Sequence, residues 1–93
     1  MKNKDVIRRF TVGREGRTKS LKTDGIVIRS YDLVIGFNLG GYSYVIDYTS
    51  LGGHWKSQTT SVHVNSLKRE SGVKTITVEE WQVMFSKQID KFY

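Results

Sequence analysis

The chain has no cysteine and no proline among its 93 residues. The absence of cysteine excludes disulfide bonds and thiolate metal sites, and with them a small disulfide-stapled secreted scaffold. No apolar run approaches the roughly 18–20 residues of a membrane-spanning helix. Residues 1–5, Met-Lys-Asn-Lys-Asp, lead into further charge and not into the apolar core of a signal peptide. We therefore expect a cytoplasmic protein with no membrane partner.

The residues that are present have the composition of an ordinary folded domain, with 38% hydrophobic and 26% charged side chains. A chain of 93 residues is expected to form one domain, spanning 1–93. Such a domain has room for one core and one binding surface. A large catalytic cleft between two domains is not available to it.

The formal net charge of +6 lies entirely in the N-terminal third of the chain. Residues 1–29 carry nine basic side chains and three acidic ones, whereas residues 30–93 carry six of each. Such asymmetry is typical of a segment that binds an anion, most often nucleic acid. The alternatives are a solvated basic segment that keeps the protein soluble, or a surface for a protein partner.

The basic N-terminal segment, 1–25, carries little signal for secondary structure. Residues 1–12 fit a helix and a short strand equally well, because their apolar positions match both periods. Residues 13–20 are polar, basic and punctuated by glycine, which predicts an exposed loop.

Strands are predicted within residues 26–57, where a β-branched run follows the Asp24-Gly25 turn. The apolar alternation changes phase after that run, so a turn or bulge must reset the register between Arg29 and Asp32.

A central hairpin is the clearest feature of this region. Residues 32–37 and 42–48 alternate as two strands, and the intervening Asn-Leu-Gly-Gly supplies residues that tolerate positive φ angles. Residues 54–57 could add a short third strand.

Two helices are predicted after the strands. Hydroxyl residues 59–61 offer N-caps for a helix at 60–71, which would end at Gly72. Thr77 begins a capping box for a second helix at 77–92, which carries an apolar stripe. The predicted class is therefore α+β, with a small antiparallel sheet built around a central β-hairpin. One or two C-terminal helices would cover one face of that sheet.

Residues suited to catalysis or metal binding form no recognisable site. There are two histidines and no cysteine, and no carboxylates with ligand spacing, so neither a metal site nor a cofactor is predicted. Ser57, Ser61 and His63 are close in sequence, but helix capping explains the hydroxyls better than a catalytic triad does. Glu79 and Glu80 suit the positive end of a helix dipole. We expect no enzyme, no catalytic residue and no small-molecule substrate.

Aromatic residues are concentrated around the hairpin. They could form a platform on which single-stranded bases stack. The alternative is that the rings face the core while the tyrosine hydroxyls reach its rim. The residues in question are Phe37, Tyr42, Tyr44 and Tyr48, with Tyr31 and Trp55 nearby.

The predicted nucleic-acid contacts combine the basic N-terminal side chains with two of these rings. They are Arg8, Arg9, Arg14, Arg17, Lys19, Lys22, Arg29, Tyr42 and Tyr44.

Several short phrases resemble a known group of proteins. Arg17, Ser20-Leu21 and Asp24-Gly25 precede Ser30-Tyr31, and the hairpin is followed by Ser-Gln-Thr-Thr-Ser-Val-His-Val-Asn at residues 57–65. In these features the span from Gly16 to Arg69 resembles short, mostly phage-encoded proteins of unknown function. In that group a Ser-x-Thr-Thr-Ser-x-His phrase opens a helix, and the position before the histidine is commonly basic, whereas here it is Val62. The resemblance implies a bacteriophage origin, hence the host cytoplasm, and implies no activity.

Two functions remain as hypotheses. In the first, the protein binds DNA or RNA through its basic N-terminal surface, mainly by phosphate contacts. In the second, it is a protein-binding phage factor that inhibits or redirects a host enzyme or defence complex. Its basic residues would then meet an acidic host protein.

Overall fold

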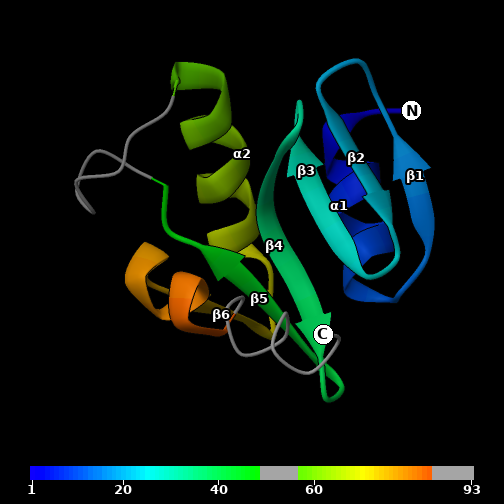
Figure 1. Ribbon diagram of the computed structural model, residues 1–93. Coiled ribbons are helices and arrows are strands. Elements are labelled where there is room, and N and C mark those ends of the chain that lie inside the picture. Colours follow the sequence, from blue (N-terminus) through cyan, green and yellow to red (C-terminus); the bar gives the residue numbers. More distant parts are fainter. Residues whose placement is uncertain (49–56, 85–93) are drawn as a thin grey trace.

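The computed structural model describes residues 1–48 and 57–84, and these residues form an α+β fold with a six-stranded sheet (Figure 1). The strands lie in the sheet in the order in which they occur along the chain. The first three are β1 (Glu15–Arg17), β2 (Leu21–Asp24) and β3 (Val27–Ser30). The others are β4 (Leu33–Leu39), β5 (Tyr42–Ile46) and β6 (Val73–Ile76). The predicted class is confirmed, but the sheet is larger than the predicted one.

The sheet is antiparallel from β1 to β5, and β6 is parallel to β5. The chain reaches β6 through helix α2 (Gln58–Arg69), since parallel strands need a crossover connection. The prediction missed β6 because only Ile76 of its four residues is buried. A strand with one buried side chain has no visible alternation.

The basic N-terminal segment is folded, and the predicted loop at 13–20 is wrong. Helix α1 (Asn3–Thr11) resolves the ambiguity at 1–12, since Val6, Ile7 and Phe10 form one buried face. β1 lies inside the predicted loop, where its side chains are exposed or half-buried. Its pairing with β2 holds it in the sheet, and backbone pairing leaves no trace in the hydrophobic pattern.

The central hairpin is confirmed. β4 and β5 pair from Gly36–Val45 to Leu39–Tyr42, and the connection is Gly40-Gly41 with φ angles of 60° and 83°. Both angles are natural for glycine and costly for other residues. A turn does lie inside the span predicted for the change of register, at Tyr31-Asp32 between β3 and β4, but the register shift itself lies just before that span, between Ile28 and Arg29.

Helix α2 begins earlier than predicted. Its N-cap is Ser57, whose Oγ accepts the Thr60 N–H at 3.1 Å, and not a residue in 59–61. The second predicted helix begins at Val78 behind a capping box. In that box the Glu80 N–H donates to Thr77 Oγ1 at 3.0 Å, and the Thr77 N–H donates to Glu80 Oε1 at 3.3 Å. It is helical through residue 84. Residues 85–92 of this predicted helix lie outside the described residues, as do residues 54–56 of the strand predicted at 54–57. The last residue of that predicted strand, Ser57, is the N-cap of α2.

Helices cover both faces of the sheet, whereas the sequence predicted cover on one face only. α1 and α2 share a face. Phe10 of α1 lies against Gly36 on β4, and His63 of α2 contacts Ser30 on β3, and both strand positions face the same side of the sheet. The helical residues 78–84 lie on the opposite face, where the Trp81 ring stacks on Phe37 with centroids 5.0 Å apart. α1 lies behind β2 and β3 in Figure 1. No helix within residues 1–48 and 57–84 is long and apolar enough to cross a membrane.

Candidate nucleic-acid interface

Three of the predicted basic residues form a row across adjacent strands. Arg17 on β1 lies opposite Lys22 on β2, and Lys22 lies opposite Arg29 on β3. Residues directly opposite one another in antiparallel strands project from the same face. Because neighbouring strands are about 4.8 Å apart, the three Cα atoms span about 10 Å. The backbone ladder thus holds three cations side by side, and we call these residues the basic row.

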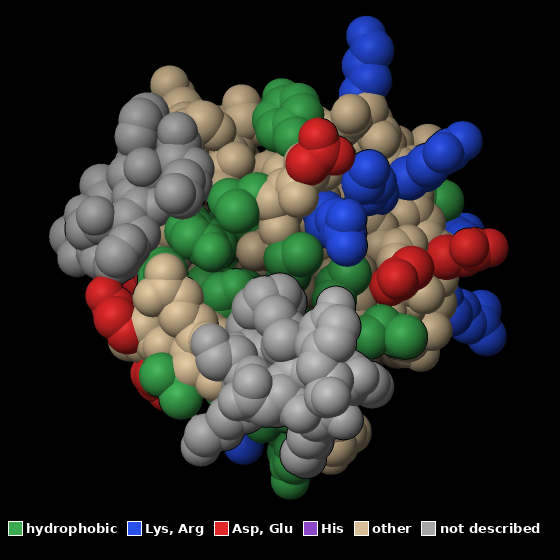
Figure 2. All heavy atoms as spheres, viewed as in Figure 1, with side chains coloured by type: hydrophobic (Ala, Val, Ile, Leu, Met, Phe, Trp, Pro, Cys, Tyr) green, Lys and Arg blue, Asp and Glu red, His purple; other side chains and the backbone are tan. Residues whose placement is uncertain are grey.

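The basic row faces away from α1 and α2. Leu21 and Thr23, the neighbours of Lys22 on β2, are buried toward those helices, and alternation along the strand turns Lys22 to the other side. All three members of the row are exposed. Figure 2 shows this face, and most of its blue side chains lie over the half formed by β1–β3.

Like charges directly opposite one another destabilise a sheet, so the basic row is a cost to folding. Lys22 forms an ion pair with Asp32, with Nζ and Oδ1 3.7 Å apart, but Asp32 is 98% exposed and the pair is weak. Within the described residues, Arg17 and Arg29 have no carboxylate at ion-pair distance. Both guanidinium groups are therefore available to an external anion.

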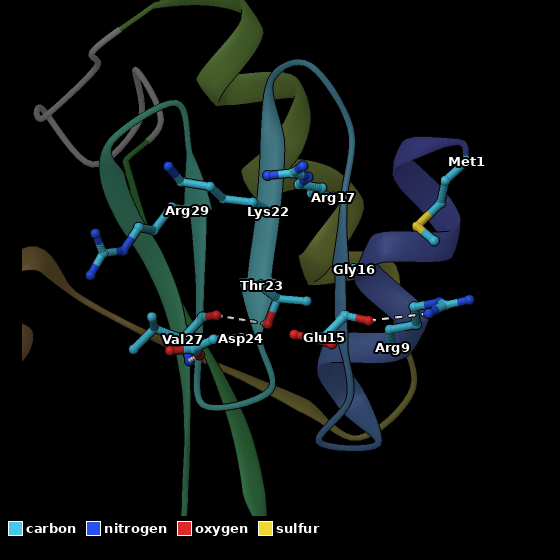
Figure 3. A pocket seen from close by; sticks show the side chains of 10 residues that line it. All are labelled: Met1, Arg9, Glu15, Gly16, Arg17, Lys22, Thr23, Asp24, Val27 and Arg29. Atoms are coloured by element: carbon cyan, nitrogen blue, oxygen red, sulfur yellow. Dashed lines mark hydrogen bonds between the residues drawn. The ribbon is translucent and has the colours of Figure 1, made fainter.

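A hollow of about 720 Å³ adjoins the basic row and extends around the outer strand β1 (Figure 3). Arg9 of α1 lines it from the far side of that strand, and its Nη1 donates to the outward carbonyl of Glu15 at 3.2 Å. Gly16 makes this crossing feasible, since a Cβ there would lie 2.7 Å from Arg9 Cδ. Arg9 thereby becomes a fourth cation at the same hollow.

Two carboxylates also line the hollow, Glu15 and Asp24, which lie opposite one another on β1 and β2. Asp24 Oδ1 accepts the N–H groups of Ile26 at 2.9 Å and Val27 at 3.0 Å. These backbone hydrogen bonds lower the pKa of Asp24 below its usual value. Asp24 therefore stabilises the β2–β3 turn. Because the two carboxylates would repel an anion, the anion-binding part of the hollow is the part at the basic row.

The remaining predicted basic residues lie apart from the row. Arg8 lines a smaller hollow on α1, together with Met1, Asp5 and Arg9. Arg14 is exposed between α1 and β1, and Lys19 is exposed in the β1–β2 turn. The structure thus gathers four of the seven predicted cations, Arg9, Arg17, Lys22 and Arg29, at one hollow.

The predicted tyrosines are not brought to the basic row. Tyr44 lies on β5 and stacks on Phe37 with ring centroids 5.1 Å apart, next to the helical residues 78–84. Tyr42, also on β5, is exposed, but Lys74 Nζ lies 4.2 Å from its ring centroid. Phe37 and Tyr48 are buried in the core, so they cannot serve as stacking platforms. Trp55 lies outside the described residues.

A buried polar network is the feature that the sequence reasoning missed. His63 on α2 is only 2% exposed, and its Nδ1 lies 2.7 Å from Ser30 Oγ on β3. Ser30 Oγ is 3.1 Å from Thr60 Oγ1, which accepts from Ser57 at 3.0 Å. The serine hydroxyl beside His63 Nδ1 is therefore that of Ser30, which is buried, and not that of Ser57 or Ser61. The network packs α2 against the sheet.

The other ring nitrogen of His63 extends the network to α1 and to the β1–β2 turn. His63 Nε2 lies 3.3 Å from Asn3 Nδ2 and 3.4 Å from Ser20 Oγ. Thr18 donates to Asn3 Oδ1 at 2.6 Å, so the Asn3 amide presents N–H to the imidazole. Nε2 is then the acceptor, and Nδ1–H donates to Ser30. Burial lowers the pKa of His63, which favours this neutral form.

Comparison of the chain with protein-family models, curated proteins and solved structures found no match. In the structure, segments that are far apart in the sequence are connected by side-chain hydrogen bonds. Ser20 and Ser30 come from the first part of the span for which a resemblance to phage proteins is predicted, and Thr60 and His63 come from the second part. These residues serve one packing network, and the resemblance itself remains a prediction.

Proposed function

We propose that this protein binds nucleic acid through the basic row of Arg17, Lys22 and Arg29, with Arg9 at the edge of the same surface. The observation that carries the proposal is the register of β1, β2 and β3, which sets three cations opposite one another. Like charges in that arrangement oppose folding unless an anion offsets them. A polyanion offsets all of them at once and releases counterions when it binds.

The shape of the surface favours an extended ligand. The row runs across the strands for about 10 Å at the usual strand spacing, and it is exposed throughout. Arginine guanidinium groups suit phosphate because they can donate two parallel hydrogen bonds. Contacts of this kind position the backbone of a nucleic acid and carry little sequence preference. A phage-encoded protein acting in the host cytoplasm is part of the same proposal.

The alternative partner is an acidic host protein, whose carboxylates would occupy the same row. In that case the protein inhibits or redirects a host enzyme or defence complex, and the charges mainly raise the association rate. The nucleic-acid proposal is preferred because the row consists of charged, exposed side chains. A protein interface normally has an apolar centre.

The decisive experiment is fluorescence anisotropy with labelled single- and double-stranded DNA and RNA across a salt series. Three phosphate contacts predict a slope of log affinity against log salt of about −2 for single strands. The variant Arg17→Gln/Arg29→Gln should reduce the size of that slope by about 1.4 and weaken every sequence alike.

The matched control is Lys4→Gln/Arg69→Gln, which removes the same net charge from exposed positions on α1 and α2. It should keep the wild-type slope, because neither residue lies at the hollow. Equal losses in the two variants would mean that net charge alone attracts the nucleic acid. An absence of binding by the wild-type protein at low salt would overturn the proposal and leave the acidic protein partner.

A further inference from the structure

Tyr31 occupies a backbone conformation that is unfavourable for its residue type. It is the only non-glycine residue with a positive φ angle in the described part of the chain, at 55°. Ser30 pairs with Leu33, so Tyr31 and Asp32 form a two-residue turn between β3 and β4. Turns with a positive φ at the first central position usually place glycine there. A bulky ring at such a position is a genuine outlier.

Packing does not compensate for this strain. Tyr31 is 55% exposed and is not among the residues that form or cover the core. Its backbone N–H donates to the Ser20 carbonyl at 2.8 Å, and glycine or asparagine could make the same hydrogen bond. The side chain therefore contributes little to the fold that a smaller residue would not, while the backbone is strained to carry it. Strained residues that lack a structural reason cluster at functional sites.

The turn lies beside the basic row and begins two residues after Arg29, the member of the row on β3. Asp32, the second turn residue, is the ion-pair partner of Lys22. The hydrogen bond from the Tyr31 N–H to the Ser20 carbonyl places the β3–β4 turn beside the β1–β2 turn, which joins the strands of Arg17 and Lys22. Tyr31 thus lies two residues after Arg29 and adjacent to the ion-pair partner of Lys22, and these are two of the cations that we propose bind phosphate. Single-strand-binding proteins combine cations with an aromatic ring, because the cations follow the backbone while the ring stacks on a base.

We propose that Tyr31 stacks on an unpaired base and that the ligand of the basic row is single-stranded nucleic acid. This inference rests on the proposed function. A duplex keeps its bases stacked on one another, so it could reach the row with its phosphates but could not use the ring. The preference for single strands therefore comes from Tyr31, whereas the phosphate contacts are shared by both ligands.

Two substitutions separate the ring from the backbone strain. Tyr31→Phe keeps the ring and the strain, whereas Tyr31→Asn removes the ring and places a residue that tolerates a positive φ. We expect Tyr31→Asn to raise the melting temperature by about 4 °C or more. It should weaken single-strand binding by about 5- to 150-fold, leave duplex binding unchanged and keep the salt slope, since no charge is lost. Tyr31→Phe should bind single strands like the wild type.

The outcomes distinguish this inference from the proposed function. If the wild type binds and Tyr31→Asn binds single strands equally well, the stacking role is wrong and the phosphate role stands. Equal losses for single strands and duplexes would also overturn it, because they would indicate a disturbed row. If the wild type binds no nucleic acid at low salt, both proposals fail together.

Discussion

Ser30 and His63 are 33 positions apart in the chain, and their side chains meet at 2.7 Å between Ser30 Oγ and His63 Nδ1. The contact joins β3 to α2, and the other ring nitrogen of His63 reaches Asn3 on α1. One imidazole thus connects the strand that carries Arg29 with both helices on the opposite face. The contribution of this network to the free energy of unfolding can therefore be measured without any ligand.

Stability should decrease as the pH falls below about 6.5. Unfolded histidine has a pKa of about 6.5, and burial lowers the pKa of His63 in the folded protein. The unfolded state then binds the proton more readily, so the stabilisation is complete above pH 6.5 and is lost toward the lowered folded pKa. Urea unfolding between pH 8 and pH 5 should show this decrease.

The control for the pH dependence is His63→Gln, which should be less stable at pH 8 and should have a flatter profile down to pH 5. Asp5 and Asp24 also have lowered pKa values, set mainly by backbone hydrogen bonds, but they act at more acidic pH. A wild-type profile that stays flat between pH 8 and pH 5 would contradict the description of His63.

Removing the Ser30 hydroxyl should destabilise the protein by about 1–3 kcal/mol. Ser30→Ala leaves the Nδ1–H of His63 without an acceptor in a buried site, which costs the full desolvation of that group. Ser66→Ala is the matched control, since its hydroxyl donates only to the exposed Val62 carbonyl within α2. Chemical denaturation should place the control within about 0.5 kcal/mol of the wild type. Similar values for both variants would show that the network adds no stability.

Alanine substitutions at Gly36 and Gly16 should differ in how much they reduce stability, because the two sites have different surroundings. A Cβ at Gly36 would lie 2.7 Å from the Tyr44 carbonyl oxygen and 2.8 Å from Ile28 Cγ2, inside the core. Gly36→Ala should therefore cost about 1–3 kcal/mol. A Cβ at Gly16 meets mainly the flexible side chain of Arg9, so Gly16→Ala should cost less. Its main effect should be to displace Arg9 from the hollow, and equal destabilisation by the two variants would contradict this contrast.

The parts of the fold that were predictable have local causes. The hairpin follows from two glycines at positive φ between alternating strands, and the capping box of Thr77 and Glu80 is a pattern within four residues. β1, β2 and β6 were missed. The side chains of β1 and β6 are mostly exposed or half-buried and show no alternation, and β2 has only four residues. A turn or bulge was predicted between Arg29 and Asp32, but the positive φ at Tyr31 had no signal, since tyrosine rarely adopts it.

The candidate site was only partly predictable for a related reason. The excess of positive charge near the N-terminus is visible in the composition, and four of the predicted cations do line one hollow. Their arrangement as a row depends on the pairing register of β1, β2 and β3, which the sequence does not state. Arg8, Arg14 and Lys19 are equally basic, yet the fold places them elsewhere. The number of basic residues therefore indicates an anionic ligand, whereas the strand register decides which of those residues form the candidate site.

Amide NMR spectroscopy during titration with a short single-stranded oligonucleotide tests the central claim most directly. The account predicts that the largest chemical-shift changes fall on Arg17, Lys22, Arg29 and Tyr31, with little change along α2. The same residues should respond to RNA and to DNA, since phosphate contacts dominate. Changes confined to α2 or to β5, or an unchanged spectrum at low salt, would contradict the account.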